Sequence, residues 1–380
     1  MRKNTETVDY LIVGGGLFGV YAALYLAGKG YRICLVEKEK ALFRKASIVN
    51  QARLHGGYHY PRSIATAVMS DDHKERFTAE HRPFIHFSFE KYYAIDRFGS
   101  FTNAAQFERF CEYLSIRCEP VLQHPLIDFQ RIEALFRTTE YTFDPYLIAD
   151  HYTRRVQEAS AQIDLRLFTC IRQAEQSGDK WAVELQDAAG ENPATLLAGA
   201  VINATYAGSN AVNRQFGLRE IDLMHEISEI ALLSAPTLQG LGLTVMDGPF
   251  GSIMPFGKSG LHSLSSVAYT HHKVSYENLP HFDCQRQRAD CRPDLLADCN
   301  ECAVKPRSNY RKMFAQMKQY FRPEIGWQYF HSLFTIKSKL RANYIDDGRP
   351  TEINRLHDDP PFYCIFAGKI NSIYEIEKVV

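Results

Sequence analysis

The sequence lacks an excess of charge of either sign, a long apolar segment and an internal repeat. Lys and Arg together number 44, as do Asp and Glu, so the overall charge does not point to nucleic acid or to an anionic membrane. No run of about 20 uninterrupted apolar residues is present that would span a bilayer. The basic start before an apolar run superficially resembles a signal peptide, but Glu6 and Asp9 interrupt it. We therefore expect neither a membrane segment nor a secretory leader.

Disulfide bonds are not expected either. Nine cysteines without a secretion signal predict a reducing environment, a cytoplasmic location and mostly free thiols. The length of 380 residues exceeds what one compact core usually holds, which predicts two closely joined domains. With 45% hydrophobic and 12% aromatic residues, the composition suits a globular α/β protein.

The most informative segment that is present runs from Asp9 to Glu37. It reads as a buried strand, a glycine-rich turn, a helix and a second strand that ends on an acid. The strands are expected at Tyr10–Val13 and Arg32–Val36, and the helix at Val20–Ala27. The turn carries the pattern G-x-G-x-x-G at Gly14, Gly16 and Gly19. This order of elements is typical of a dinucleotide-binding unit.

Each part of this unit has a physical role in binding a dinucleotide. Gly14 permits a tight turn out of the strand, Gly16 lets the backbone approach a pyrophosphate, and Gly19 lets helix and strand pack closely. The helix N-terminus offers unpaired N–H groups and the positive end of its dipole to phosphates. Glu37, at the tip of the second strand, is placed to accept hydrogen bonds from a ribose diol.

The sequence after Glu37 favours a flavin over a nicotinamide dinucleotide. A nicotinamide-binding domain would continue with regular βα units, whereas this chain enters an irregular, basic stretch that is crowded with His and Tyr. The next strand of the same type comes much later, at Ala198–Asn210, and another lies near the C-terminus. A nucleotide domain built from separated pieces is typical of glutathione-reductase-like flavoproteins.

Four blocks make the resemblance specific. They are the N-terminal unit, the segment Ser47–Ser63, the segment FDPYLIADHYTRRVQEA with the later VINATYAG, and the C-terminal RANYIDDGRPTEI with FAGKINS. Together they resemble the D-amino-acid-oxidase superfamily of FAD-dependent oxidoreductases, which includes glycine and sarcosine oxidases. Within Ser47–Ser63, the order of Asn, His-x-Gly, Tyr and Pro is most similar to L-2-hydroxyglutarate dehydrogenases. The resemblance implies a Rossmann-like FAD domain and a substrate domain with a mixed or antiparallel sheet.

The resemblance also implies which residues hold FAD. The pyrophosphate would lie on the glycine-rich turn, the adenosine ribose beside Glu37, and the flavin beside the loop around Asn50 and the start of a final helix. Such a helix N-terminus would face the flavin edge on which negative charge accumulates during reduction. The full set is Gly14, Gly16, Leu17, Phe18, Gly19, Glu37, Lys38, Ser47, Asn50, Gln51, Ala52, Arg53, Asn203, Ala204, Thr205, Gly368, Lys369, Ile370, Asn371 and Ser372. Thr205-Tyr206 departs from the family's usual Ala-Gly at that position.

A cluster of His, Tyr and Arg residues in the same loop supplies the candidates for chemistry. Oxidation of an alcohol or amine needs a base for the O–H or N–H proton, and histidine suits that role at neutral pH. His55 is the first choice and His59 the second, and a role in holding only the cofactor stays open for both. Arg53 or Arg62 could bind a substrate carboxylate with two hydrogen bonds.

Near the C-terminus, an Arg followed by Asp-Gly-x-Pro resembles a sequence element of the family that borders the substrate site. Arg341 is therefore a further candidate carboxylate anchor, followed by the run Asp346–Pro350. A hairpin with Asp-Gly as its turn explains the run equally well.

A Cys-rich insertion, residues 281–305, stands outside the family core. It holds Cys284, Cys291, Cys299 and Cys302, and the last two form C-x-x-C. Four thiolates at such spacing could hold a structural Zn²⁺, although the intervals do not match a standard zinc ribbon. A plain insertion with free thiols and a redox-active disulfide are the alternatives.

The predicted FAD domain comprises residues 1–75, 145–220 and 335–380, and the substrate domain comprises residues 76–144 and 221–334. We expect an FAD-dependent oxidoreductase that dehydrogenates a CH–OH or CH–NH centre of a small hydroxy or amino acid. The expected partners are a carboxylate-bearing small molecule and an electron acceptor that the sequence does not name. A flavin-dependent mutase acting on a sugar nucleotide and a flavin-binding redox sensor with a Cys-rich metal site are the two alternatives.

Overall fold

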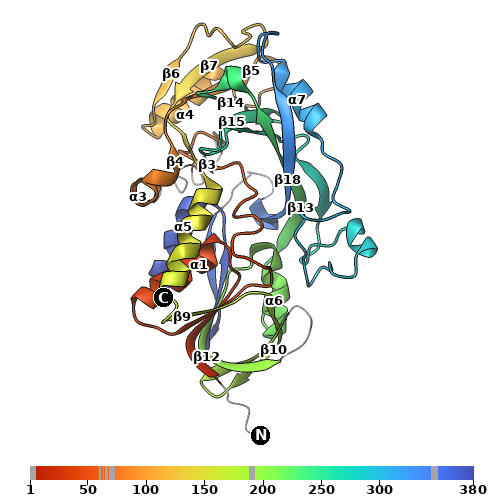
Figure 1. The fold of residues 1–380 in the computed structure, drawn as a ribbon. Coiled ribbons are helices and arrows are strands. Elements are labelled where there is room, and N and C mark those ends of the chain that lie inside the picture. Colours follow the sequence, from red (N-terminus) through yellow and green to blue (C-terminus); the bar gives the residue numbers. More distant parts are fainter. Residues whose placement is uncertain are drawn as a thin grey trace.

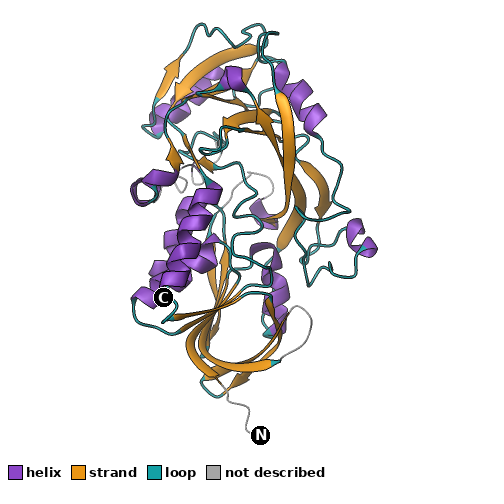
Figure 2. Cartoon of the chain, viewed as in Figure 1, coloured by secondary structure: helices purple, strands orange, loops and turns teal. Residues whose placement is uncertain are grey.

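The computed structural model describes residues 6–59, 61, 62, 64, 67, 73–187, 193–343 and 350–380. Two large sheets organise these residues, one in the lower and one in the upper part of Figure 1. The long strands β13 and β18 run from the upper part towards the lower one. Figure 2 shows that long loops fill much of the region where the two parts meet.

The first sheet joins strands from three separated stretches of the chain. Among the described residues it has eight strands, in the order β10-β11-β12-β1-β2-β9, with β20 beside β12 and β19 beside β20. Their bounds are β1 Glu6–Val13, β2 Ile33–Val36, β9 Ile163–Arg166, β10 Thr169–Ser177, β11 Lys180–Asp187, β12 Ala194–Asn203, β19 Glu352–Asp358 and β20 Pro361–Phe366. The discontinuous nucleotide-binding sheet that the sequence predicted is thus confirmed, while the residue limits of the two domains stay a prediction.

The register of this sheet places the ends of its parallel strands at one level. Val13 of β1 is opposite Val36 of β2 and opposite Asn203 of β12, and Asn203 is opposite Cys364 of β20. The segments that leave these strands therefore emerge at one edge of the sheet. In open parallel sheets, ligands bind outside this carboxyl edge.

Helices cover both faces of the first sheet, because successive side chains along each strand point to opposite faces and both sets are apolar. Ile12 packs with α1 (Leu17–Gly28), α5 (Pro145–Glu158) and the final 3₁₀ helix η6 (Ile370–Lys378) in one apolar cluster. Leu11 and Val13 point to the other face, where α6 (Ser209–Gln215) contributes Val212. Helix α5 begins where Asp144 Oδ1 accepts hydrogen bonds from the N–H groups of Tyr146 and Leu147, which caps its first turn.

The second sheet is mostly antiparallel. Among the described residues its order is β17-β13-β16-β15-β14-β5-β7-β6, and β18 pairs with β13. The bounds are β5 Glu90–Asp96, β6 Cys118–Pro120, β7 Ile132–Thr138, β13 Leu223–Ser234, β14 Leu241–Met246, β15 Gly251–Pro255, β16 His262–Ser266, β17 His271–Ser275 and β18 Gln328–Leu340. Only β14 and β5 pair in parallel among these strands. The mixed or antiparallel sheet predicted for the substrate domain is confirmed.

A small sheet and further helices complete the described chain. The small sheet joins β3 (Arg53–Leu54), β8 (Tyr141–Phe143) and β4 (Ile85–His86). The remaining helices are α3 Lys74–Glu80, α4 Ala104–Tyr113, α7 Tyr310–Lys318, and the 3₁₀ segments η1 Arg82–Phe84, η2 Tyr206–Gly208, η3 Pro236–Leu238, η4 Asp283–Gln287 and η5 Arg341–Asn343. In the part of the chain that is described, no helix has the length and apolar character needed to cross a membrane.

Candidate functional site

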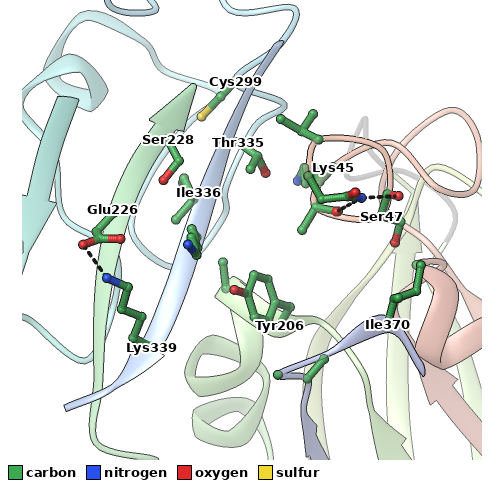
Figure 3. A pocket seen from close by; sticks show the side chains of 18 of the residues that line it. Lys45, Ser47, Tyr206, Glu226, Ser228, Cys299, Thr335, Ile336, Lys339 and Ile370 are labelled. Carbon is green, nitrogen blue, oxygen red and sulfur yellow. Dashed lines mark hydrogen bonds and ion pairs between the residues drawn. The ribbon is translucent and has the colours of Figure 1, made fainter. Parts of the chain in front are cut away.

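One large cavity of about 1200 Å³ opens at the carboxyl edge of the first sheet. Its lining includes Val13, Val36 and Ala204 from the ends of β1, β2 and β12, and Thr244 and Ser252 from the second sheet. Figure 3 shows part of this cavity, with Lys45 and Ser47 on one side and Glu226, Ser228 and Thr335 on strands facing them. The cavity is therefore bounded by both sheets.

The glycine-rich turn forms one wall of the cavity, as predicted. Gly14 has φ +108°, a backbone conformation that favours glycine, and an added Cβ would lie 2.8 Å from the carbonyl oxygen of Ala204. At Gly19 an added Cβ would lie 2.0 Å from the carbonyl oxygen of Gly14, so only glycine allows α1 to pack this close to the turn. The N–H of Leu17 donates to Ser47 Oγ at 3.0 Å. Ser47 thus joins the predicted phosphate-binding turn.

The acid after β2 lies beside this turn. Glu37 Oε2 accepts the N–H of Gly15 at 2.6 Å, and its Oε1 accepts the N–H of Glu39 at 2.9 Å. Each oxygen of a carboxylate can accept more than one hydrogen bond, so Glu37 can still bind a ribose hydroxyl. Burial and the neighbouring Lys45 cation lower the pKa of Lys38 to about 8. Lys38 and Lys45 both line the cavity here.

The loop around Asn50 reaches the second sheet. Asn50 Nδ2 donates to the carbonyl oxygen of Ser47 at 3.0 Å, while its Oδ1 accepts the N–H of Ala52 at 2.7 Å. Ala52 has φ +53°, and the Asn50 bond supports this turn. Gln51 Nε2 donates to Ser265 Oγ on β16 at 2.8 Å. These bonds fix the loop that precedes Arg53 and His55.

Most residues predicted to hold FAD line this cavity. The lining ones are Gly14, Gly16, Leu17, Phe18, Glu37, Lys38, Ser47, Asn50, Gln51, Arg53, Ala204, Thr205, Gly368, Lys369, Ile370 and Asn371. Gly19, Ala52, Asn203 and Ser372 are not part of the lining. Asn203 is buried and its Nδ2 donates to the Ser209 carbonyl and to Asn213 Oδ1, both at 2.9 Å, so it braces the start of α6. The predicted final helix is present, as the 3₁₀ helix η6.

Arg53, His55 and Glu140 form a buried charged group at one part of the cavity. His55 Nδ1 lies 3.4 Å from Glu140 Oε1, and Arg53 Nε lies 3.8 Å from Glu140 Oε2. The side chain of Glu140 is 0% exposed and that of Arg53 is 1% exposed. Among the described residues, Arg53 Nε and Nη1 have no hydrogen-bond partner. Nε faces Glu140, so Nη1 is the guanidinium nitrogen left to donate to a ligand beside His55.

The electrostatics of this group follow from burial. Burial, with the Lys369 cation, lowers the pKa of His55 to about 3, so the imidazole is neutral at physiological pH. Burial and the Arg53 cation likewise hold the pKa of His59 well below its usual value. Burial alone would raise the pKa of Glu140, but the bond from His55 and the Arg53 charge lower it, so Glu140 is a carboxylate. A neutral His55 whose Nδ1–H faces this carboxylate presents Nε2 as a proton acceptor.

Glu140 was not predicted from the sequence. It lies in the turn between β7 and β8, where no motif marks it, and the fold alone brings it to Arg53. Tyr93 on β5 donates its hydroxyl to Glu140 Oε2 at 3.0 Å. Lys91 on the same strand is also buried and donates to Thr244 Oγ1 at 2.5 Å. Arg53 Nη2 in turn donates to Ser252 Oγ, so both side chains are held by hydroxyl groups of the second sheet.

The comparisons with known proteins agree with this geometry. Residues 9–262 match the DAO family, described as FAD dependent oxidoreductase. The chain belongs to this family. It is 23% identical over 378 residues to FAD-dependent monooxygenase FPY4 of Fusarium mangiferae, covering 96% of this chain and 87% of that one.

Solved structures share the fold of this DAO-family protein. L-alpha-glycerophosphate oxidase from Mycoplasma pneumoniae, a structure with FAD bound, aligns with TM-score 0.70 and 16% identity over 98% of this chain and 94% of that one. Glycine oxidase from Geobacillus kaustophilus aligns with TM-score 0.68 and 13% identity over 97% and 91%. The predicted FAD-dependent oxidoreductase, with its Rossmann-like domain and mixed-sheet domain, is confirmed. The narrower resemblance to L-2-hydroxyglutarate dehydrogenases stays a prediction.

FAD fits the residues that line the cavity. The crowded glycines let the backbone approach a pyrophosphate, Glu37 offers oxygens to a ribose, and the cavity continues from there to Arg53 and His55. Lys369, at the start of η6, is 9% exposed and lines the same cavity. A cation at this place would favour the negative charge that a flavin gains on reduction.

The structure does not place Arg341, the further predicted carboxylate anchor, in this cavity. Arg341 Nη2 donates to the carbonyl oxygens of Tyr276 and Leu223, and its Nε lies 3.1 Å from Asp222 Oδ1. Arg341 is not among the lining residues. Residues 346–349 of the predicted Asp346–Pro350 element lie outside the described residues. Arg62 does line the cavity, with Nε 2.5 Å from Asp247 Oδ2.

The Cys-rich insertion holds free thiols. Within the described chain, no three His, Cys, Asp or Glu side chains are grouped so that they could hold a metal ion, and all nine cysteines are free. Cys284 and Cys299 pack against an apolar cluster, and Cys291 Sγ accepts the N–H of Ala297 at 3.5 Å. Among the described residues the structure thus gives no support to the zinc predicted at Cys284, Cys291, Cys299 and Cys302.

Proposed function

We propose that this protein dehydrogenates a CH–OH or CH–NH centre in a small hydroxy or amino acid that carries a carboxylate. The observation that carries the proposal is the buried Arg53, whose Nη1 has no hydrogen-bond partner among the described residues, beside a neutral His55. FAD, when bound, supplies the acceptor for the hydride that leaves the carbon. The protein then has to bind the acid and remove one proton.

Arg53 binds the substrate carboxylate in this proposal. The N–H groups of Nη1 can donate to an oxygen of the carboxylate, and the guanidinium charge attracts it. Glu140 offsets one of the positive charges nearby, whereas Arg53 and Lys369 supply two cationic side chains that line the cavity. The local excess of positive charge favours an anionic substrate over a neutral one.

His55 takes the proton of the substrate O–H or N–H at Nε2. Glu140 holds the opposite ring nitrogen, and its negative charge stabilises the imidazolium that forms. The carbon then becomes a carbonyl or an imine as its hydrogen leaves with both bonding electrons. The similarity of Ser47–Ser63 to L-2-hydroxyglutarate dehydrogenases supports 2-hydroxy acids as the first substrates to try.

A second candidate function is monooxygenation. It is supported by FPY4, which is named an FAD-dependent monooxygenase and aligns over 96% of this chain. In that case a reduced nicotinamide nucleotide, and not the acid, would reduce the flavin. The two candidates therefore differ in which compound bleaches the flavin absorption without oxygen.

The test is anaerobic mixing of the purified holoprotein with a panel of 2-hydroxy acids, amino acids and their methyl esters, and separately with NADPH and NADH. The proposal predicts bleaching by at least one acid and much weaker bleaching by its ester, which lacks the charge that Arg53 binds. Bleaching by a nicotinamide nucleotide alone would contradict it and support monooxygenation. Activity on a sugar nucleotide only after dithionite reduction would instead support the mutase alternative.

A His55→Ala variant tests the base. Loss of a general base lowers the rate of the reductive step by about 10²–10⁴-fold. The rate of flavin bleaching by the best acid, measured anaerobically, should fall by this amount while FAD stays bound. A variant that is reduced at the wild-type rate would remove His55 from the proposed mechanism.

A further inference from the structure

The Cys-rich insertion lies against the loop that follows Glu37. Lys45 Nζ donates to the carbonyl oxygen of Leu296 at 2.8 Å, and Arg44 Nη2 lies 3.3 Å from Asp298 Oδ2. Glu301 accepts from Arg44 and lies 3.2 Å from Lys40 Nζ. Lys40, Arg44 and Lys45 of this loop thus all contact the short segment of the insertion from Leu296 to Glu301.

The insertion is anchored to the second sheet on its other side. Leu296 and Phe282 are buried in an apolar cluster with Ile227 of β13 and Phe334 and Ile336 of β18. Asn300 Oδ1 also accepts the N–H of Phe334 at 3.2 Å. The insertion therefore connects the sheet on which the substrate would lie with the loop beside the glycine-rich turn.

This connection runs along the wall of the cavity. Leu295, Leu296, Ala297 and Cys299 line it, as do Arg44 and Lys45 of the facing loop. Figure 3 shows Cys299 close to Thr335 of β18, with Lys45 on the opposite loop. Glu37 and Lys38, the expected ribose contacts, lie in the same loop as Arg44 and Lys45.

We propose that the Cys-rich insertion is a clamp that closes the cofactor groove on its adenosine side. The apolar cluster holds the insertion on β13 and β18, and the ion pairs of Asp298 and Glu301 hold the loop of residues 38–45 against it. Release of FAD then requires these contacts to open. The clamp uses the established cofactor and is independent of the substrate proposed above.

Asp298 contributes more to the clamp than Glu301. The side chain of Asp298 is 5% exposed, whereas that of Glu301 is 52% exposed. An ion pair with a buried partner loses little strength to solvent screening, while exposed pairs contribute little. Neither carboxylate lines the cavity, so neither can contact FAD directly. Their removal tests the clamp without removing a cofactor contact.

The experiment compares FAD release from wild-type holoprotein with release from the double variant Asp298→Asn/Glu301→Gln. Release is followed as the activity regained by an apoflavoprotein, present in excess, that captures each FAD as it leaves. We expect the double variant to release FAD about tenfold faster or more, which corresponds to a loss of roughly 1.4 kcal/mol. Glu301→Gln alone should change the rate far less.

A matched control removes an equivalent pair elsewhere. Arg166 is bound by Asp164 and Glu6 at an edge of the first sheet, and none of the three lines the cavity. The variant Asp164→Asn/Glu6→Gln should release FAD at the wild-type rate. The clamp is refuted if Asp298→Asn/Glu301→Gln releases FAD no faster than wild type, or if the control accelerates release equally. Should the double variant not fold, the release rate of Asp298→Asn alone decides in the same way.

Discussion

At the scale of single residues, Glu140 sets the charge around the proposed base and the proposed carboxylate anchor. It is fully buried, faces His55 on one oxygen and Arg53 on the other, and accepts the hydroxyl of Tyr93. A buried carboxylate is stable here only because cations and donors surround it. Glu140 therefore acts through His55 and Arg53 as a positioning residue.

The variant Glu140→Gln should slow anaerobic reduction of the flavin by the best acid. Without the carboxylate, the pKa of His55 falls further, so His55 becomes a weaker base that is already deprotonated at lower pH. We expect the limiting rate at saturating acid to fall by about 10²-fold while FAD stays bound. The measurement is the limiting rate of anaerobic reduction at neutral pH, with the bound FAD quantified for each variant.

Tyr93→Phe is the matched control for this variant. It removes one hydrogen bond to Glu140 but keeps the negative charge, so the limiting rate should stay close to wild type. A Glu140→Gln variant that holds FAD and is reduced at the wild-type limiting rate would contradict the proposed role of Glu140.

Residues within one continuous motif could be predicted from the sequence, and residues joined only by the fold could not. His55 and Arg53 follow the cofactor loop directly, and Gly14, Gly16 and Glu37 belong to one βαβ unit. Glu140 comes from the short connection between β7 and β8, far along the chain and without a local pattern. Arg341 was proposed from family spacing, but its neighbours in space are the carbonyl oxygens of Leu223 and Tyr276.

At the scale of elements, the packing of α1 against the glycine-rich turn determines whether the cofactor site forms. Gly19 lies where the helix touches the turn, and Gly28 ends the same helix with nothing within 4 Å of an added Cβ. Gly19 is therefore closely packed and Gly28 has open space around it, although both belong to α1. The first strand, this helix and the second strand were predicted because their pattern is local, with limits that differ by up to a few residues.

Gly19→Ala should therefore displace α1 and weaken FAD binding. Overpacking of this kind costs about 1–3 kcal/mol. We expect the purified variant to lose FAD on gel filtration and to unfold at lower urea concentration than wild type. Gly28→Ala should retain FAD, with stability within about 1 kcal/mol of wild type, because alanine suits a helix at this open position. Equal FAD retention by both variants would contradict this account of the turn.

At the scale of the whole molecule, buried neutral histidines couple folding to pH. Burial lowers the pKa of His81 to about 4 and that of His225 to about 4. His81 is 2% exposed, and its ring nitrogens lie 2.9 Å from the carbonyl oxygen of Phe77 and 2.8 Å from the hydroxyl of Tyr152. Between pH of about 4 and the ordinary histidine pKa of about 6.5, each of these histidines binds a proton in the unfolded chain but stays neutral in the folded chain.

Stability should therefore fall as the pH drops from about 6.5 towards 4. At pH 5 each such histidine lowers the free energy of unfolding by about 2 kcal/mol relative to neutral pH. Urea unfolding of His81→Gln should show a smaller loss between pH 7.5 and pH 5 than wild type. His281→Gln, at an exposed position, is the control and should keep the wild-type loss. An unchanged loss in His81→Gln would contradict the proposed coupling.

The arrangement of the two sheets places the cofactor groove and the charged group of Arg53, His55 and Glu140 in one cavity. We propose that an acid bound in this cavity gives up a hydride from carbon to the flavin. The most direct test is anaerobic rapid mixing of the holoprotein with the best acid, carrying either hydrogen or deuterium on the carbon to be oxidised. We predict bleaching of the flavin absorption that is slower with deuterium. The absence of bleaching by any hydroxy or amino acid, with rapid bleaching by NADPH, would contradict it.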